Sequence, residues 1–176
     1  GYAETLAEEA SGDARKYLDI ILRHADRLIE LTQDLLALAE LEEKGIALRR
    51  EAIDWRELLN NVCVLFEKKF AEKNLGLQVF LPDDTAPAVF HGDRYRLEQM
   101  LINLLDNALR YTETGGAFVR LRRDEGGLVI TVCDSGIGIP AADLPRIFER
   151  FFVADKARSR QSGGTGLGLS IVKHIV

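Results

Sequence analysis

The sequence predicts an α+β protein in which a helical segment precedes a mixed β-sheet that carries helices on one face. Three observations indicate this class. Residues 14–43 place apolar side chains at heptad-like spacing, beyond residue 50 short β-rich runs alternate with two helical patterns, and the runs at 117–123 and 128–134 are separated by turn residues. The order strand, helix, two strands, helix and hairpin is typical of helices packed on one side of a mixed sheet.

The composition is that of a globular chain with one core of ordinary size and a smaller appendage. The chain has 176 residues, of which 47% are hydrophobic and 29% charged. Its net charge of −5 argues against a nucleic-acid partner, which usually needs a basic face. No apolar run approaches the roughly 18 residues that span a bilayer, so we expect no membrane contact by this segment. Cys63 and Cys133 are expected to be buried reduced thiols rather than a disulfide or a metal site.

The first helical segment predicts dimerisation. Residues 1–10 are interpreted as the end of a helix that is broken at residues 11–13. The long helix that follows has an apolar stripe formed by Leu18, Ile21, Ala25, Leu28, Thr32, Leu35 and Ala39, widened by Leu22, Ile29 and Leu36. One antiparallel hairpin cannot cover so wide a stripe, so we predict a four-helix bundle formed by two copies. The alternative is that this helix packs onto the second domain of its own chain.

The residues after Gly45 predict the α/β unit. A linker at 46–54 contains the first strand, at 51–54, and Asp54 caps a helix at 55–74. Leu58, Val62, Leu65, Phe66 and Phe70 are expected to form the buried face of that helix. Strands are predicted at 77–81 and 88–91, and Asp93 caps a helix at 94–112.

Two glycine clusters predict a binding site for a nucleotide. Asp134 follows the apolar strand 128–133 and precedes Gly136 and Gly138, so a carboxylate stands at a strand end beside bare backbone. Residues 163–168 are glycine-rich and lead into a helix, whose unpaired amides suit phosphate groups. The required lysine of a Walker loop is missing, and no dinucleotide fingerprint follows the first strand. Alone, each cluster is more often a turn or a helix cap.

The helix at 94–112 adds a third element to this site. Its apolar stripe consists of Leu97, Met100, Leu101, Leu104, Leu105 and Ala108. Asn103 and Asn107 lie one turn apart on a neighbouring face, where two amide oxygens could reach one Mg2+ ion. A solvated polar edge is the alternative. The combination with the glycine clusters favours a nucleotide site.

These motifs resemble those of the bacterial sensor histidine kinases of two-component systems, within the ATP-binding group shared with the gyrase, Hsp90 and MutL ATPases. In order, the N, G1, F and G2 boxes of that family are similar to residues 103–112, 134–139, 147–152 and 164–168. Residues 1–6 and 155–161 are most similar to the PhoR-type phosphate-sensing kinases.

The resemblance implies a division of the chain into three parts. Residues 1–45 would be a partial dimerisation and histidine-phosphotransfer hairpin, 46–54 a linker with the first strand, and 55–176 an α/β sandwich that binds ATP. We expect the phosphoacceptor histidine to precede this chain, because His24, His91 and His174 lack its motif. We also expect the family's last pair of strands to be missing after Val176. A cytoplasmic segment is implied, although full-length family members are usually anchored in the inner membrane.

The resemblance also assigns site residues. The base would be bound by Asp134 through the adenine amino group, with Gly136, Gly138 and Ile139 beside it and Tyr111 along the purine. Mg2+ would be held by Asn107 with help from Asn103, and Arg110 would lie near the phosphates. The phosphates themselves would be bound by the loop Gly164, Thr165, Gly166, Leu167 and Gly168, and residues 150–165 would form a lid over ATP.

The expected reaction depends on Asn103. The ATPase relatives have a glutamate at this position, which can activate water, whereas an amide cannot accept a proton at neutral pH. Asn103, Asn107 and Arg110 are therefore expected to support transfer to a histidine, for relay to a response regulator receiver domain. One departure is Val153, where the family commonly has an arginine; Arg150, Arg158 or Arg160 would have to replace it. The alternative is a dimeric ATP-binding regulator without catalysis.

Overall fold

The computed structural model describes residues 11–42, 49–82, 89–125, 127–154 and 164–176. The predicted helical tail at 1–10 and the end of the long helix at Gly45 lie outside the described residues, as do residues 155–163 of the predicted lid. Every other predicted helix and strand is present, with its ends shifted by at most two residues.

The elements follow the predicted order. They are α2 (Asp13–Glu42), β1 (Arg50–Asp54), α3 (Trp55–Glu72), β2 (Gly76–Phe80), β3 (Val89–Asp93), α4 (Arg94–Tyr111), β4 (Gly116–Asp124), β5 (Gly127–Asp134), the 3₁₀ turn η1 (Leu144–Arg146) and α6 (Gly168–Ile175). Asp54 and Asp93 cap their helices as predicted: their carboxylates accept from the backbone N–H of Arg56 (2.8 Å) and of Arg96 (3.3 Å).

The predicted mixed sheet is formed by three of the strands. Strand β4 is central, with β2 parallel to it on one side and β5 antiparallel on the other. Strands β1 and β3 pair with each other in a separate antiparallel ladder, which the prediction of one mixed sheet did not distinguish. Val119 of β4 stands between Val79 and Val132 in register, so these side chains face the same side of the sheet.

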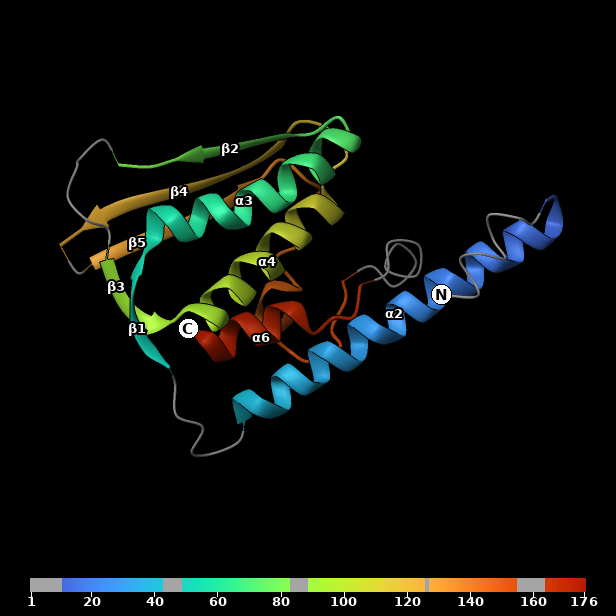
Figure 1. Cartoon of the computed structure of the whole chain (residues 1–176), viewed down its shortest axis with the longest axis horizontal. Helices are drawn as coiled ribbons and strands as arrows, with labels where there is room; N and C mark the ends of the chain where they lie inside the picture. The colour runs from blue at the N-terminus through green and yellow to red at the C-terminus, as the bar shows by residue number, and fades with distance from the viewer. Residues whose placement is uncertain (1–10, 43–48, 83–88, 126, 155–163) are drawn as a thin grey trace.

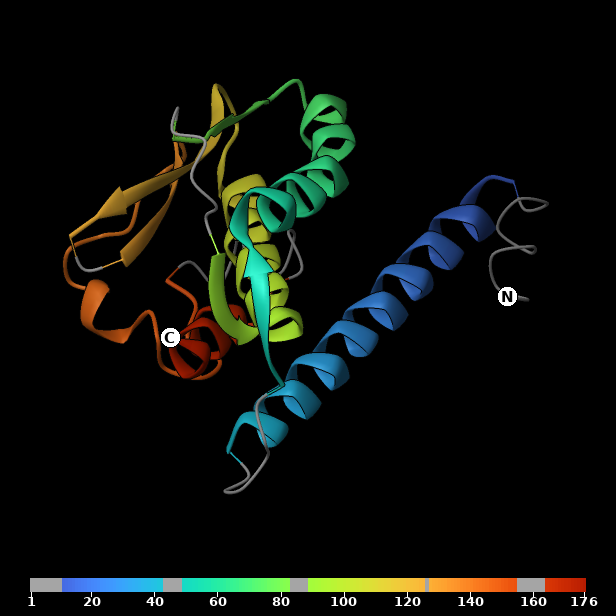
Figure 2. The same ribbon diagram turned by 60° about the vertical axis from the view of Figure 1, so that its left-hand side comes forward.

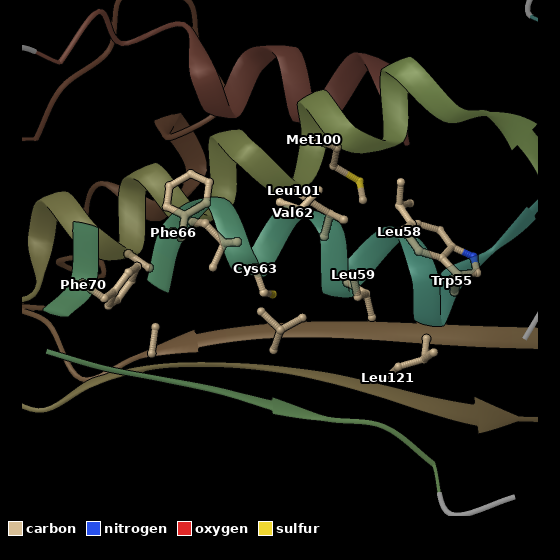
Figure 3. Close-up of a cluster of buried hydrophobic side chains, with 14 of the residues drawn as sticks. Trp55, Leu58, Leu59, Val62, Cys63, Phe66, Phe70, Met100, Leu101 and Leu121 are labelled. Carbon is tan, nitrogen blue, oxygen red and sulfur yellow. The ribbon is translucent and has the colours of Figure 1, made fainter. Parts of the chain in front are cut away.

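The helices are layered on one face of this sheet, as predicted. Helices α3 and α4 lie against the sheet, α6 packs on α4, and α2 packs on α6 and projects well beyond it (Figures 1 and 2). Under α3 and α4 lies one continuous apolar core (Figure 3), whose fully buried members include Leu58, Phe66, Phe70, Leu101, Leu105 and Val119. The site described below therefore rests on a packed scaffold.

The buried face of α3 differs from the prediction at one position. Leu65 is 62% exposed, whereas Leu59 and Cys63 are buried in its place. Helix α3 contacts both the sheet and α4, so its buried arc extends toward Leu59 and Cys63 and away from Leu65. Burial, with a smaller contribution from Glu67, raises the pKa of the Cys63 thiol to about 11. Cys133, predicted to be buried, is half-buried, and both cysteines are free.

Helix α2 has two apolar sides. Ala37 and Leu38 are buried against Leu167 and Ile171, with Leu31 and Leu41 beside them. The stripe predicted to dimerise lies largely on the opposite side of the helix and is open: Ile21, Leu28 and Leu35 are between 45% and 65% exposed. Intramolecular packing, the alternative weighed for this helix, thus occurs on another face and leaves the predicted stripe available.

None of the described helices combines the length and the apolar character needed to cross a membrane.

Candidate nucleotide-binding site

The loop after β5 holds Asp134 at the edge of a cavity. Ser135 anchors this loop: its hydroxyl donates to the carbonyl of Thr114 and accepts from the N–H of Gly116, each at 2.9 Å. The Asp134 carboxylate accepts from the N–H of Gly136 through Oδ1 at 2.9 Å. This bond orients the carboxylate through one of its two oxygens, so Oδ2 can still accept from a donor on a ligand.

Gly136 is required by close packing. A Cβ atom at this position would lie 2.5 Å from the carbonyl oxygen of Tyr111 and 2.7 Å from Oδ1 of Asp134. Any side chain here would therefore displace the carboxylate or the end of α4. The N–H of Ile137 donates to the same Tyr111 carbonyl at 3.3 Å, which ties the loop to α4.

Helix α4 presents both predicted asparagines to the cavity. The Asn103 amide nitrogen donates to the carbonyl of Gln99 at 3.0 Å, and its Oδ1 lies against Gly168, where a Cβ atom would come within 2.8 Å. Asn103 is therefore part of the packing between α4 and the start of α6. The Asn107 amide makes no hydrogen bond within the described part of the chain, and it remains open to a ligand.

The glycine loop before α6 is held from two sides. Gly166 has a φ of 73°, and a Cβ atom there would lie 2.8 Å from the backbone of Phe151. The Thr165 hydroxyl accepts from the N–H of Leu167 at 3.2 Å and donates to Asp34 of α2 at 2.7 Å. The loop is thus clamped between the 147–152 segment and α2.

These three elements enclose one cavity of about 970 Å³ together with α2 and the segment 147–154. Most of the predicted site residues line it, namely Asn103, Asn107, Arg110, Tyr111, Asp134, Gly138, Ile139, Gly164, Thr165, Gly166 and Gly168. Gly136 is not among the residues that line the cavity. The Leu167 side chain is fully buried against α2, so only its backbone is placed to serve the loop.

The residues present fit a nucleotide with its metal ion. The Nη1 atom of Arg110 is buried and has no hydrogen-bond partner among the described residues. A buried unpaired donor is costly unless it meets an acceptor, and a phosphate oxygen is such an acceptor. The amide oxygen of Asn107 is a suitable ligand for Mg2+. The bare backbone at Gly164, Gly166 and Gly168 allows phosphates to approach closely.

Two carboxylates at the cavity were not predicted from the sequence. Burial is the main cause that raises the pKa of Asp106, and it likewise raises the pKa of Asp34. Arg110 opposes the rise for both groups. Asp106 stands between the asparagines and could have been noticed. Asp34 is 131 residues from its partner Thr165, and no local signal reveals it.

Of the three arginines considered as replacements at Val153, Arg150 has a different partner in the structure. Arg150 forms an ion pair with Glu42 at the end of α2 and does not line the cavity, whereas Val153 does. Arg158 and Arg160 lie outside the described residues.

The fold and the cavity define an ATP-binding domain of the class shared by histidine kinases, gyrase and Hsp90. Residues 92–176 match the family model described as "Histidine kinase-, DNA gyrase B-, and HSP90-like ATPase". Residues 1–44 match the "His Kinase A (phospho-acceptor) domain". Within this class, the chain belongs to the sensor histidine kinases.

Individual proteins are similar over most or nearly all of the chain. The sensor histidine kinase WalK of Bacillus subtilis is 34% identical over 99% of this chain and 29% of its own length. Full-length ShkA in complex with AMPPNP has a TM-score of 0.76 at 29% identity, covering 97% of this chain and 35% of ShkA. The catalytic domain of ThkA is 32% identical with a TM-score of 0.63, covering 73% of this chain and 80% of that domain.

A structure of ThkA with the response regulator protein TrrA matches the whole chain with a TM-score of 0.73 at 26% identity and 48% coverage of that chain. The present chain spans less than a third of WalK and 16% of the sensor kinase RcsC of Escherichia coli.

Replacing Asp106 with asparagine should stabilise the protein at neutral pH. A carboxyl whose folded-state pKa is raised binds its proton more tightly when folded, so it contributes stability below its ordinary value of 3.8 and loses that contribution as pH rises through the folded pKa. Asp106→Asn removes this loss. Thermal melts should therefore show a higher midpoint for Asp106→Asn at pH 7 and a shrinking difference as pH falls toward 4.

The matched control is Asp124→Asn, in the exposed β4–β5 hairpin, where a backbone N–H and Arg122 lower the pKa of the carboxyl. This variant should show no gain at pH 7. An Asp106→Asn protein less stable than wild type at pH 7 would contradict the argument.

Proposed function

We propose that this chain carries the ATP site of a sensor histidine kinase that transfers the γ-phosphate of ATP to a histidine outside the chain, for relay to an aspartate of a response regulator. One observation carries the proposal. A single cavity brings together a strand-end carboxylate, a glycine loop at a helix start, and two groups without a hydrogen-bond partner among the described residues, the Asn107 amide and the buried Nη1 atom of Arg110. The structure of ThkA with TrrA supports a response regulator as the downstream partner.

Asp134 would select the base. Its free oxygen accepts from the adenine amino group, whereas guanine presents a carbonyl oxygen at that place and would leave the carboxylate unpaired. Asp134 is exposed in the structure, so the discrimination depends on the bound base covering the carboxylate: guanine would then leave it without a partner and away from water. Tyr111 and Ile139 would flank the purine, since both line the cavity beside Asp134.

Arg110, Asn107 and the loop 164–168 would position the phosphates. Phosphoryl transfer needs mainly positioning and neutralisation of charge. Mg2+, when bound, would neutralise part of the phosphate charge. In the protein, Arg110 contributes a positive charge, Asn107 an amide oxygen for the ion, and the loop its backbone N–H groups. Asn103 would keep α6 in place, because its oxygen packs on Gly168.

The choice between transfer and hydrolysis rests on Asn103. A general base is needed to activate water, and the carboxamide of Asn103 cannot serve. Its nitrogen already donates to Gln99, so the side chain is committed to structure. Transfer to a histidine is therefore favoured over hydrolysis.

Binding of ATP should depend on Asp134. Calorimetry with ATP and Mg2+ should give a dissociation constant for Asp134→Asn about 10- to 100-fold above that of the wild-type chain, because a hydrogen bond to a charged group is lost. GTP should bind the wild-type chain weakly. Asp124→Asn, at the other end of the same hairpin, serves as the control and should bind ATP normally. A folded wild-type chain with no affinity for ATP would refute the nucleotide site.

Phosphotransfer separates the kinase from a regulator that only binds ATP. The chain is mixed with [γ-32P]ATP, Mg2+ and a dimerisation segment of a sensor kinase that contains its acceptor histidine. We expect acid-labile label on that segment and little release of inorganic phosphate. The same segment with histidine replaced by glutamine should stay unlabelled. ATP binding without any transfer would favour the regulatory alternative.

We also propose that α2 dimerises through its open stripe, in a cytoplasmic assembly. The exposure of Ile21, Leu28 and Leu35 on one side of the helix supports this proposal. In the full-length protein a membrane anchor would lie outside this segment.

A charge on the stripe should prevent association. Sedimentation of the wild-type chain should show a dimer, and Leu28→Glu combined with Leu35→Glu should shift it to a monomer, since two charges would be buried without partners. Leu65→Glu is the control, because Leu65 is an equally exposed apolar residue on α3 and should leave the dimer intact. A double variant that sediments like the wild type would exclude this interface.

A further inference from the structure

Asp34 brings a negative charge from α2 to the glycine loop. Its carboxylate accepts from the Thr165 hydroxyl at 2.7 Å, and that hydroxyl accepts in turn from the N–H of Leu167 at 3.2 Å. One of the loop's backbone donors is thus paired within the protein. The Thr165 hydroxyl, which could otherwise face a phosphate, is directed to α2.

Asp34 also interacts electrostatically with Arg110, the arginine proposed to bind the phosphates. The positive charge of Arg110 lowers the pKa of Asp34, although burial raises it overall. Arg110 interacts in the same way with Asp106. The guanidinium therefore lies in the field of two carboxylates, while its Nη1 atom has no hydrogen-bond partner in the described residues. A phosphate group and Asp34 would compete for the same positive charge.

The docking of α2 keeps Asp34 in this place. Glu40, further along α2, accepts from Arg96 of α4 at 2.8 Å, and the Arg96 side chain is only 10% exposed. Ala37 and Leu38 lie buried between these two polar contacts. Asp34 is therefore fixed at the cavity wall for as long as α2 is docked.

We propose that Asp34 determines how strongly the site binds nucleotides according to their number of phosphates. While α2 is docked, its carboxylate repels the phosphate groups at residues 164–168, so it weakens the binding of ATP more than that of ADP and leaves adenosine unaffected. This inference rests on the proposed function, because it takes the cavity to be the nucleotide site.

The effect works in both directions. If docking through Asp34 weakens ATP binding by a given factor, ATP must weaken that docking by the same factor. ATP should therefore loosen the contact between α2 and the glycine loop, whereas adenosine should not.

The test is a calorimetric series with ATP, ADP, AMP and adenosine in the presence of Mg2+. Asp34→Asn keeps the size of the side chain and an oxygen that can accept from Thr165, but it removes the charge. We expect this variant to bind ATP about five- to tenfold more tightly than the wild-type chain. The gain should be smaller for ADP, smaller again for AMP and absent for adenosine.

Two further variants isolate the charge. Asp26→Asn makes the same change at an exposed position of α2 that does not line the cavity, and it should bind all four ligands as the wild type does. Asp34→Ala removes the charge and also releases the Thr165 hydroxyl, so it should bind ATP at least as tightly as Asp34→Asn does. Thermal melts establish that each variant is folded.

The outcomes separate this inference from the proposed function. Binding by the wild-type chain that Asp34→Asn leaves unchanged, or changes equally for ATP and adenosine, would overturn the role of Asp34 alone. Absence of ATP binding by a folded wild-type chain would overturn the proposed function, and the role of Asp34 with it.

Discussion

The structure depends on helix α4, which packs into the hydrophobic core on one side and lines the cavity on the other. One side of the helix places Leu101 and Leu105 in the core, where neither is exposed to solvent. The other side carries Asn103, Asn107 and Arg110 to the cavity. Because core side chains are close-packed and cannot shift freely, the polar groups on the same rigid helix are held in fixed positions. The apolar packing thus keeps the polar side chains of the site at fixed positions relative to one another.

The sequence predicts the repeating parts of this arrangement well. Apolar spacing, capping residues and turn residues locate every α-helix and strand of the described chain, because these signals are local, but they do not reveal the 3₁₀ turn η1. The error at Leu65 has a different origin: the buried arc of α3 depends on two neighbours, the sheet and α4, and spacing alone does not reveal them. The separate ladder of β1 and β3 was missed for the same reason, since strand pairing is a tertiary property.

The candidate site divides in a similar way. Its glycines and asparagines are recognisable because the chemistry demands those residue types at those spacings. Asp34 is not recognisable, because it reaches Thr165 only after α2 has folded back on α6. Leu167 illustrates the opposite case: it lies inside a binding motif, yet its side chain belongs to the contact with α2. Sequence patterns are therefore least informative where two distant segments of the chain, here α2 and the glycine loop, come into contact.

The two apolar sides of α2 have a consequence for any measurement in solution. One side of α2 packs on α6 and forms part of the cavity wall, and the other side is exposed along the length of the helix. A second copy bound to the open side would contact the same helix that forms the cavity wall. Self-association and ligand affinity would then be thermodynamically linked. Nucleotide affinity would then vary with protein concentration, and titrations made at one dilution would not describe the molecule at another.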